Sequence, residues 1–468
     1  MKTNKKTVAE KLTTAQGGKA TRITALQNLK RSVMSCMLFE DIYYEDGVSV
    51  SDRIKELVSK VKHEDAVKVA ISARNDMHLR HAPLWIARWL AQYPEAKVSE
   101  LLPQIIQRAD ELAEFVAMYW KEKKQPLSKQ VKKGLAKAFQ NFNEYQLAKY
   151  NRDGEVKLRD VLFLCHAKPI DQAQADLWKK LVDKTLQTPD TWETNLSAGK
   201  DKKETFTRLI EEKKLGGMAL LRNLRNMEES KVDSKLIKEA ILNMKTDKIL
   251  PFRFISAAKY APKFEPELET AMFKCLEGQP KLPGKTILVV DTSGSMYGGR
   301  LSGKSELTRD DAAAALAMLV REIAEEPRIY ATAGDDYAHV HATKLLPPRK
   351  GFALRDLICN GSLNREIGGG GIFITQCIDY IKKQEEDADR IIIITDEQDC
   401  DYASGTHASD KAKPFGKHNY LINISVERNG VGYGPKWVHI DGFSEKVIDF
   451  ILEYEKEEAE IESQQNVV

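Results

Sequence analysis

The sequence is poor in cysteine and contains no long apolar run. Its six cysteines include no Cys-x-x-Cys pair and are Cys36, Cys165, Cys275, Cys359, Cys377 and Cys400. This spacing argues against a structural zinc site and a disulfide framework, so we expect free thiols. No stretch of about 18 uncharged apolar residues occurs, and the polar, lysine-rich start lacks the apolar middle of a secretory signal. We therefore expect a cytoplasmic protein.

Neither sign of charge dominates the 468 residues, whose formal net charge is +3. The two parts of the chain nevertheless differ. Residues 1–280 hold 50 Lys and Arg against 38 Asp and Glu, or +12, whereas residues 281–468 hold 22 against 31, or −9. Such asymmetry indicates that the first part meets a polyanion and that the second part has another role.

Strand-like alternation is scarce before residue 280. Apolar residues there recur at helical spacing, as in Ile54, Leu57, Val58 and Val61, which fall at i, i+3, i+4 and i+7. Many such segments in succession, joined by short connections, favour stacked helical pairs over a single compact bundle. We therefore predict an α-helical-repeat (HEAT-like) domain over residues 1–280.

The pattern changes at about Pro283. Short β-branched apolar runs at 286–293, 328–334, 390–397 and 420–426 are separated by helical stretches such as 308–326 and 375–386. Runs that are apolar on both faces and alternate with helices are typical of an α/β doubly wound parallel sheet. We assign this domain to residues 281–453 and an acidic tail that frays to residues 454–468.

A carboxylate and two hydroxyls follow the first of these strands at alternate positions: Asp291, Ser293 and Ser295. Ligands of open α/β sheets bind at the carboxyl ends of the strands, which is where this loop must lie. Hard oxygen donors suit magnesium, manganese or calcium. Asp396 ends another strand and is expected to approach the same point.

Three other interpretations of this loop compete with a metal site. An aspartyl-phosphate enzyme would need a second carboxylate where Ser293 stands. An aspartic protease would need a second such loop, and the sequence has none. The serines could also simply cap the next helix.

The Asp-x-Ser-x-Ser pattern resembles the metal-ion-dependent adhesion site (MIDAS) of von Willebrand factor type A domains. The resemblance implies a divalent ion held by Asp291, Ser293, Ser295 and Asp396, with an open position that accepts a partner's carboxylate. That family adds a Thr from a Gly-Gly-Thr loop. Here Gly368 to Gly371 is followed by Ile372, and Thr375 stands about three residues late. We therefore expect weak ion binding.

Basic and aromatic side chains are interleaved in the first part of the chain. Lysines 121, 123, 124, 129, 132, 133 and 137 precede Phe139, Phe142, Tyr145 and Tyr150. Such a mixture suits the phosphates and unstacked bases of RNA. The alternatives are that the lysines form a solvated face and that the aromatics belong to the core.

Two windows, KYNRDGEVKLRDVLFLCHAKP at 149–169 and GGMALLRNLRNM at 216–227, resemble the Ro autoantigen family, the TROVE-domain RNA-binding proteins. Domain order, charge and length agree with this resemblance. It implies helical repeats that close into a ring with the type A-like domain. It also implies small noncoding Y-like RNA on the outer basic surface and the 3′ single-stranded ends of misfolded RNA in the central hole. We further expect a monomeric protein, with a nuclease or other protein partner at the type A-like domain.

The resemblance also implies where RNA binds. Lys149 and His166 match residues of the Y RNA surface, and Arg152 is a basic neighbour without a strict counterpart. A lone histidine beside an apolar run is otherwise more often a satisfied partner of backbone or carboxylate groups than an RNA contact. Arg222, with Arg225, either faces the hole or simply extends along its helix.

We assign no catalytic role, since nothing resembles a ribonuclease site. The extra carboxylates of a two-metal nuclease are replaced by hydroxyls at this loop. The competing hypotheses are a protein-interaction scaffold that uses the MIDAS-like site and a metal-dependent hydrolase.

Overall fold

The computed structural model describes residues 24–34, 47–76, 79–151, 153–246, 249, 252–277, 280–300, 307–400, 415–424, 437–441, 447, 451–452 and 454–455. The chain divides into two compact units. The helical unit includes Gly47–Cys275, and the sheet unit combines Leu276–Val468 with the N-terminal segment that contains residues 24–34. Within the described ranges, no helix is both long enough and apolar enough to cross a membrane.

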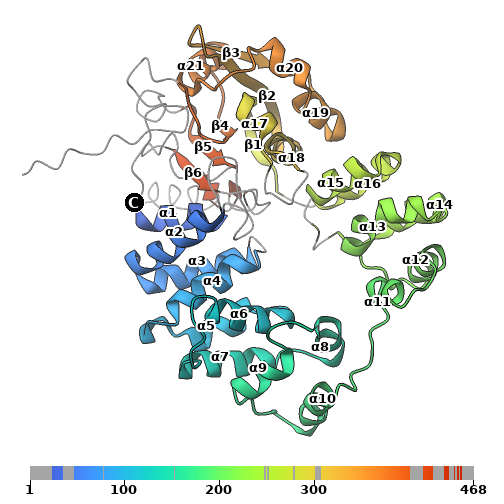
Figure 1. Cartoon of the computed structure of the whole chain (residues 1–468). Coiled ribbons are helices and arrows are strands. Elements are labelled where there is room, and N and C mark those ends of the chain that lie inside the picture. The colour runs from blue at the N-terminus through green and yellow to red at the C-terminus, as the bar shows by residue number, and fades with distance from the viewer. Residues whose placement is uncertain are drawn as a thin grey trace, which may run out of the picture. The chain divides into compact units, whose positions relative to one another are not determined.

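The helical unit is a succession of short helices (Figure 1). Contacts join helices close in sequence, such as α3 with α4, α5 with α7 and α14 with α16. The buried positions follow the predicted period, since Ile54, Leu57 and Val58 are at most 6% exposed. The helices are α2 (Gly47–Lys60), α3 (His63–Asn75), α4 (His81–Leu90), η1 (Pro94–Ala96), α5 (Val98–Ile105), α6 (Asp110–Trp120), α7 (Lys129–Phe139), α8 (Glu144–Tyr150), α9 (Leu158–Leu164), α10 (Gln172–Val182), α11 (Trp192–Ser197), α12 (Lys202–Glu211), α13 (Gly217–Glu229), α14 (Ser234–Asn243), α15 (Phe252–Tyr260), η2 (Pro262–Phe264) and α16 (Glu265–Lys274).

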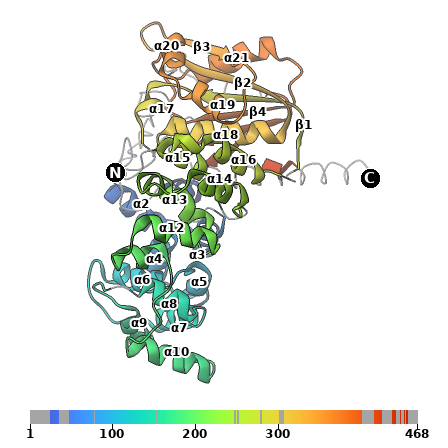
Figure 2. The same cartoon turned by 90° about the vertical axis from the view of Figure 1, so that its right-hand side faces the viewer.

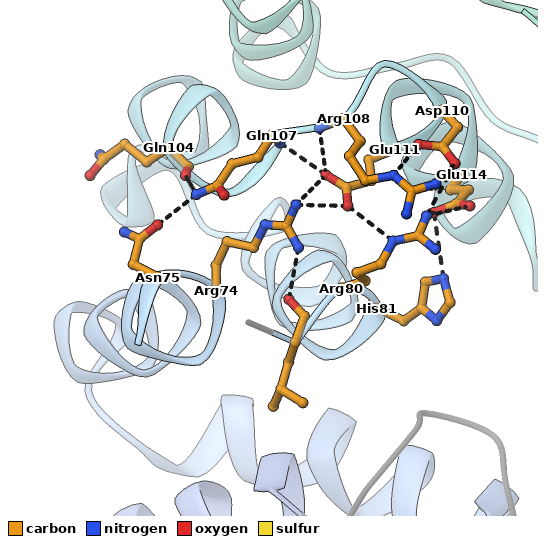
Figure 3. Close-up of polar contacts among 11 residues, drawn as sticks. Arg74, Asn75, Arg80, His81, Gln104, Gln107, Arg108, Asp110, Glu111 and Glu114 are labelled. Atoms are coloured by element: carbon orange, nitrogen blue, oxygen red, sulfur yellow. Dashed lines mark hydrogen bonds and ion pairs between the residues drawn. The ribbon is translucent and has the colours of Figure 1, made fainter. Parts of the chain in front are cut away.

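A buried carboxylate ties three of these helices together. Glu111 of α6 is 0% exposed, and both of its oxygens accept hydrogen bonds from Nη2 of Arg74, at 2.8 and 2.9 Å. Arg80 adds a bond from Nε at 3.2 Å (Figure 3). The N–H groups of Gln107 and Arg108 also donate to Glu111, at 2.9 and 3.0 Å. This carboxylate therefore fixes α3 and the start of α4 against α6.

The described part of the sheet unit contains six strands in the order β3-β2-β1-β4-β5-β6, all parallel except the edge strand β3. They are β1 (Leu282–Asp291), β2 (Ala324–Asp335), β3 (Val340–Leu345), β4 (Arg390–Thr395), β5 (His418–Asn423) and β6 (Val438–Asp441). The accompanying helices are α1 (Ala25–Met34), α17 (Gly294–Gly298), α18 (Arg309–Ile323), α19 (Gly351–Ile358), α20 (Gly361–Glu366) and α21 (Ile374–Gln384). Although α1 begins the described chain, it contacts β6 and belongs to this unit.

Helices cover both faces of the sheet (Figure 2). The chain leaves β1 through α18 for β2 on one side, and later returns through α21 to β4 on the other side. Because such crossovers are right-handed, the two helices lie on opposite faces. Ile378 and Ile381 of α21 pack against Ile287 and Ile391 of the strands. A helical-repeat part followed by a doubly wound, mostly parallel sheet is confirmed.

Two strands were not predicted from the sequence, β3 and β6. Strand β3 is half-exposed and lacks an apolar run, and β6 has only four residues. Part of the predicted acidic tail also contacts the sheet, since Glu455 accepts bonds from Nε and Nη2 of the buried Arg390 at 2.8 and 2.6 Å. Tyr454 packs edge-on against Tyr420.

Candidate functional sites

The carboxyl end of β1 lies where the strand order reverses, between β2 and β4. Open α/β sheets bind ligands in the crevice at this position. Asp291, the last residue of β1, is fully buried. Its Oδ1 accepts a hydrogen bond from the Ser293 N–H at 2.8 Å, and its Oδ2 accepts one from the Thr395 hydroxyl at 2.7 Å. The loop and the end of β4 therefore orient both carboxylate oxygens.

The two loop hydroxyls also lie together, with the Oγ atoms of Ser293 and Ser295 at 3.3 Å. Ser293 occupies the N-cap position of α17 but makes no capping hydrogen bond. The interpretation of this serine as a simple helix cap is thus not supported.

The glycine loop, Gly368 to Gly371, lies against the loop after β1 and contacts it through backbone atoms. The Gly370 carbonyl accepts a hydrogen bond from the Gly294 N–H at 2.9 Å. A Cβ at Gly294 would lie 3.3 Å from the Gly369 oxygen, which explains the close approach of the two loops. Thr375 lies in the first turn of α21, and its buried hydroxyl has no hydrogen-bond partner within the described part of the chain.

Asp396 follows β4, as predicted, but it carries a partner that the sequence did not indicate. Its Oδ2 accepts a hydrogen bond from Nη1 of Arg309 at 3.1 Å, and its Oδ1 accepts one from the Gln398 N–H at 3.2 Å. Arg309, the first residue of α18, is 2% exposed. Its signal in the sequence is an arginine in the first turn of a helix, where the helix dipole disfavours a positive charge.

The structure thus brings the four predicted metal-site residues to one edge of the sheet. Burial, together with the nearby negative charge of Asp396, raises the pKa of Asp291. The site fits a hard divalent ion only in part. Oxygen donors converge there, but the Arg309 guanidinium already binds Asp396, and the loop of Gly368 to Gly371 adds no hydroxyl. Among the described residues, no group of three or more His, Cys, Asp or Glu is arranged to hold a metal.

A further buried carboxylate, that of Glu397, follows Asp396 directly. Glu397 is 0% exposed and has a left-handed backbone with φ of 60°. Its side chain contacts Nε2 of His439 and accepts a hydrogen bond from Nδ2 of Asn423 at 3.3 Å. Strained backbone of this kind is concentrated at functional sites. Nothing in the sequence distinguishes Glu397, because its partners Asn423, at the end of β5, and His439, in the unpredicted β6, are 26 and 42 residues away.

In the helical unit, Lys149 lies near the end of α8 beside aromatic side chains. Its ammonium is 5.8 Å from the ring centroids of both Tyr145 and Tyr150. The guanidinium of Arg108 lies 4.5 Å from the Tyr150 ring. Tyr145 is 51% exposed, so this is a surface on which cations and aromatic rings alternate.

His166 follows α9 with φ of 52° and is exposed. Its exposure leaves the imidazole accessible to a ligand, which favours the RNA interpretation over a histidine satisfied by backbone or carboxylate groups. It helps to line a pocket of about 360 Å³ whose other residues are Trp120, Gln125, Pro126, Leu127, Lys132, Phe163 and Leu164. Phe163 is 59% exposed. This pocket combines aromatic and apolar walls with basic groups.

Lys149 and His166 do not share one pocket. Arg108 and Tyr150 lie beside the start of α6, whereas the His166 pocket includes Trp120 at its end. An 11-residue helix is about 16 Å long. The two groups are therefore separated by roughly the length of α6.

The other two predicted RNA-contacting residues are Arg222 and Arg152, of which the structure describes Arg222. Arg222 is exposed on α13 above the buried Leu220, Leu221 and Leu224, so its guanidinium reaches solvent. Arg152 lies outside the described residues.

The lysine-rich stretch, residues 121–142, combines lysines that reach the surface with phenylalanines that belong to the core. No ion pair is recorded, within the described chain, for Lys123, Lys124, Lys129, Lys132, Lys133 and Lys137. By contrast, Arg80 and Arg108 are neutralised by Asp110 and Glu114 (Figure 3). Phe139 and Phe142 are core residues, at 0% and 4% exposed. Free positive charge is therefore concentrated on the lysines.

Burial raises the pKa of Glu114, but a hydrogen bond from His81 and the charge of Arg80 outweigh this effect and hold the pKa below its usual value. Ion pairs of this network therefore persist at neutral pH.

Comparisons with known proteins agree with these observations. The family model described as the TROVE domain matches residues 3–185 and 183–332. A search of curated proteins found no match. Among solved structures, the crystal structure of the Deinococcus radiodurans RO (RSR) protein is similar, with a TM-score of 0.58 and 17% sequence identity over 90% of this chain and 97% of that chain. At this identity the likeness shows the shared fold.

Proposed function

Because the chain belongs to the TROVE domain family of RNA-binding proteins, we propose that it is the Ro-like RNA-binding component of a ribonucleoprotein. In this proposal the outer basic surface binds a small noncoding, Y-like RNA. The helical repeats also accept 3′ single-stranded ends of misfolded RNA in a central hole. The protein acts in RNA quality control or processing in the cytoplasm, by binding and without catalysis.

The observation that carries the proposal is the pocket beside His166. An exposed phenylalanine and a tryptophan provide faces on which bases stack, while Lys132 and His166 supply donors to phosphates. The ammonium of Lys124 lies 5.0 Å from the Trp120 ring, which adds a positive charge to this aromatic wall. A surface that combines these groups suits unpaired nucleotides better than an acidic protein, which would not need the exposed rings.

The lysines without ion pairs supply the second support. Phosphate contacts by lysine release condensed counterions, so affinity depends on salt. The ion-paired arginines beside Glu111 are already neutralised and are expected to contribute little to this term.

The test is the affinity for a labelled RNA stem-loop, with and without a single-stranded 3′ tail, across a salt titration. For six or more phosphate contacts we expect a loss of about 10³-fold or more between about 50 and 200 mM salt. An affinity that stays flat over this range would remove the phosphate interpretation and favour the protein-interaction scaffold. Nucleic acid that co-purifies with the protein, seen by its ultraviolet absorbance, would support the RNA proposal.

A divalent ion at Asp291, Ser293, Ser295 and Asp396 stays a prediction, as do a nuclease or other protein partner of the type A-like domain and a monomeric state. When bound, such an ion would offer an open coordination position to a partner's carboxylate. The chain's own residues there orient Asp291 through Thr395 and balance Asp396 with Arg309.

A further inference from the structure

Arg309 places a positive charge inside the site formed by Asp291, Ser293, Ser295 and Asp396 at the carboxyl ends of β1 and β4, here called the strand-end site. Its guanidinium and the Asp396 carboxylate, 3.1 Å apart, are 2% and 0% exposed. An ion pair so far removed from water is weakly screened, and a carboxylate left without its partner there would be strongly disfavoured. The pair is therefore a stable part of the site.

The local backbone specifies this conformation of Arg309. The Arg309 N–H donates to the Gly299 carbonyl at 2.8 Å, which holds the start of α18 beside the loop after α17. A Cβ at Gly299 would lie 2.7 Å from Cδ and 2.8 Å from Nε of Arg309. Any side chain at position 299 would therefore clash with Arg309, and glycine leaves the space that the Arg309 side chain needs to reach Asp396.

The Arg309 guanidinium supplies part of the positive charge that a metal ion would bring to these carboxylates. Two buried carboxylates of like charge, Asp291 and Asp396, need a cation nearby, and Arg309 already supplies one unit of positive charge. A divalent ion that enters must share Asp396 with this charge and be repelled by it. The glycine loop offers no additional hydroxyl to offset the repulsion.

We propose that Arg309 is the resident counter-cation of Asp396 and that it keeps the affinity of the Asp291–Ser293–Ser295 loop for divalent ions low. Removal of the guanidinium converts the same residues into a site that binds a divalent ion tightly. The proposal concerns the sheet unit alone and is independent of RNA binding.

The test is calorimetric titration of the full chain with manganese and with magnesium, for the wild type and for Arg309→Gln. We expect Arg309→Gln to bind about tenfold more tightly, or more, because a buried like-charge contact is removed. The matched control is Arg321→Gln, which removes the same charge from α18 about 18 Å further along the helix and is expected to bind like the wild type. Equal affinity of the wild type and Arg309→Gln would overturn the proposal.

Thermal melting provides a second measurement, which remains informative even if Arg309→Gln folds poorly without an ion. In chelator, Arg309→Gln leaves Asp396 without its partner and is expected to melt below the wild type. Manganese should then raise its melting temperature, or restore its circular dichroism if it is unfolded, while the wild type changes little. A variant that the ion neither stabilises nor refolds would contradict the proposal.

Discussion

The guanidinium of Arg108 lies over the ring of Tyr150, 4.5 Å from its centroid, although Arg108 precedes α6 and Tyr150 ends α8, 42 positions later in the sequence. Tyr150 ends α8 directly after Lys149, whose ammonium lies near the same ring. Two cations are thus held around one aromatic side chain. Because Asp110 neutralises Arg108, Lys149 is the cation of this pair that is open to phosphate.

Reversing the charge at this surface should weaken one class of RNA more than another. The change of Lys149 and Arg152 together to Glu is expected to reduce the affinity for a structured stem-loop more than for a single strand with a free 3′ end. The reason is that the family resemblance places structured RNA on this outer surface. Fluorescence anisotropy with both labelled RNAs measures the difference.

The control for this prediction is Lys202 and Lys203 changed to Glu, which makes the same charge change at exposed positions of α12. This control should affect both RNAs only slightly. An equal loss for both RNAs in the Lys149 and Arg152 variant would mean that they share one site.

Removing the aromatic face of the pocket beside His166 should weaken binding of unpaired nucleotides. Stacking of a base on an aromatic side chain contributes about 1–3 kcal/mol, so Phe163→Ala is expected to cost about 5- to 150-fold in affinity. The measurement is a binding titration with a short single-stranded RNA.

Ile170→Ala is the matched control, because Ile170 is an apolar side chain of similar exposure, at 69%, that does not line the pocket. It should bind RNA like the wild type. If Phe163→Ala also bound like the wild type, the pocket would not be a base-binding site.

Neutralising Glu111 should destabilise the helical unit. Glu111→Gln leaves the buried Arg74 without its carboxylate, and breaking a buried ion pair costs about 3–5 kcal/mol. Hydrogen exchange of the α6 amides should report this loss of local stability. Glu229→Gln, which breaks an exposed pair with Arg225, should change stability by less than about 1 kcal/mol. Similar effects of the two variants would show that burial adds nothing to the Glu111 network.

RNA binding should not depend on the strand-end site. The basic excess lies before residue 280, and the loop at Asp291 lies in a segment of net charge −9 that repels RNA. Asp291→Ala, with its fold verified by circular dichroism, is expected to keep RNA affinity within about threefold, which is below the ~1 kcal/mol of a lost contact. Loss of RNA binding in this variant, or in chelator, would assign the ion site to RNA.

Some features were determined by the sequence alone because they depend on local periodicity and order along the chain. The buried stripe of Ile54, Leu57 and Val58 and the apolar run before Asp396 predict their helix and strand without knowledge of any partner. The position of Asp291, Ser293 and Ser295 at the end of β1 follows in the same way. The two windows at 149–169 and 216–227 likewise indicated the family.

Only the tertiary structure decided which charged groups are partners. Arg309 and Asp396 are 87 residues apart, and Arg74 and Glu111 are 37 apart, so no local pattern distinguishes these pairs from solvated charges. The exposure of His166 was undecided for the same reason, since burial depends on what packs against a residue. Hydrophobic spacing specifies which face of an element turns inward, whereas an ion pair forms only where two distant backbones meet.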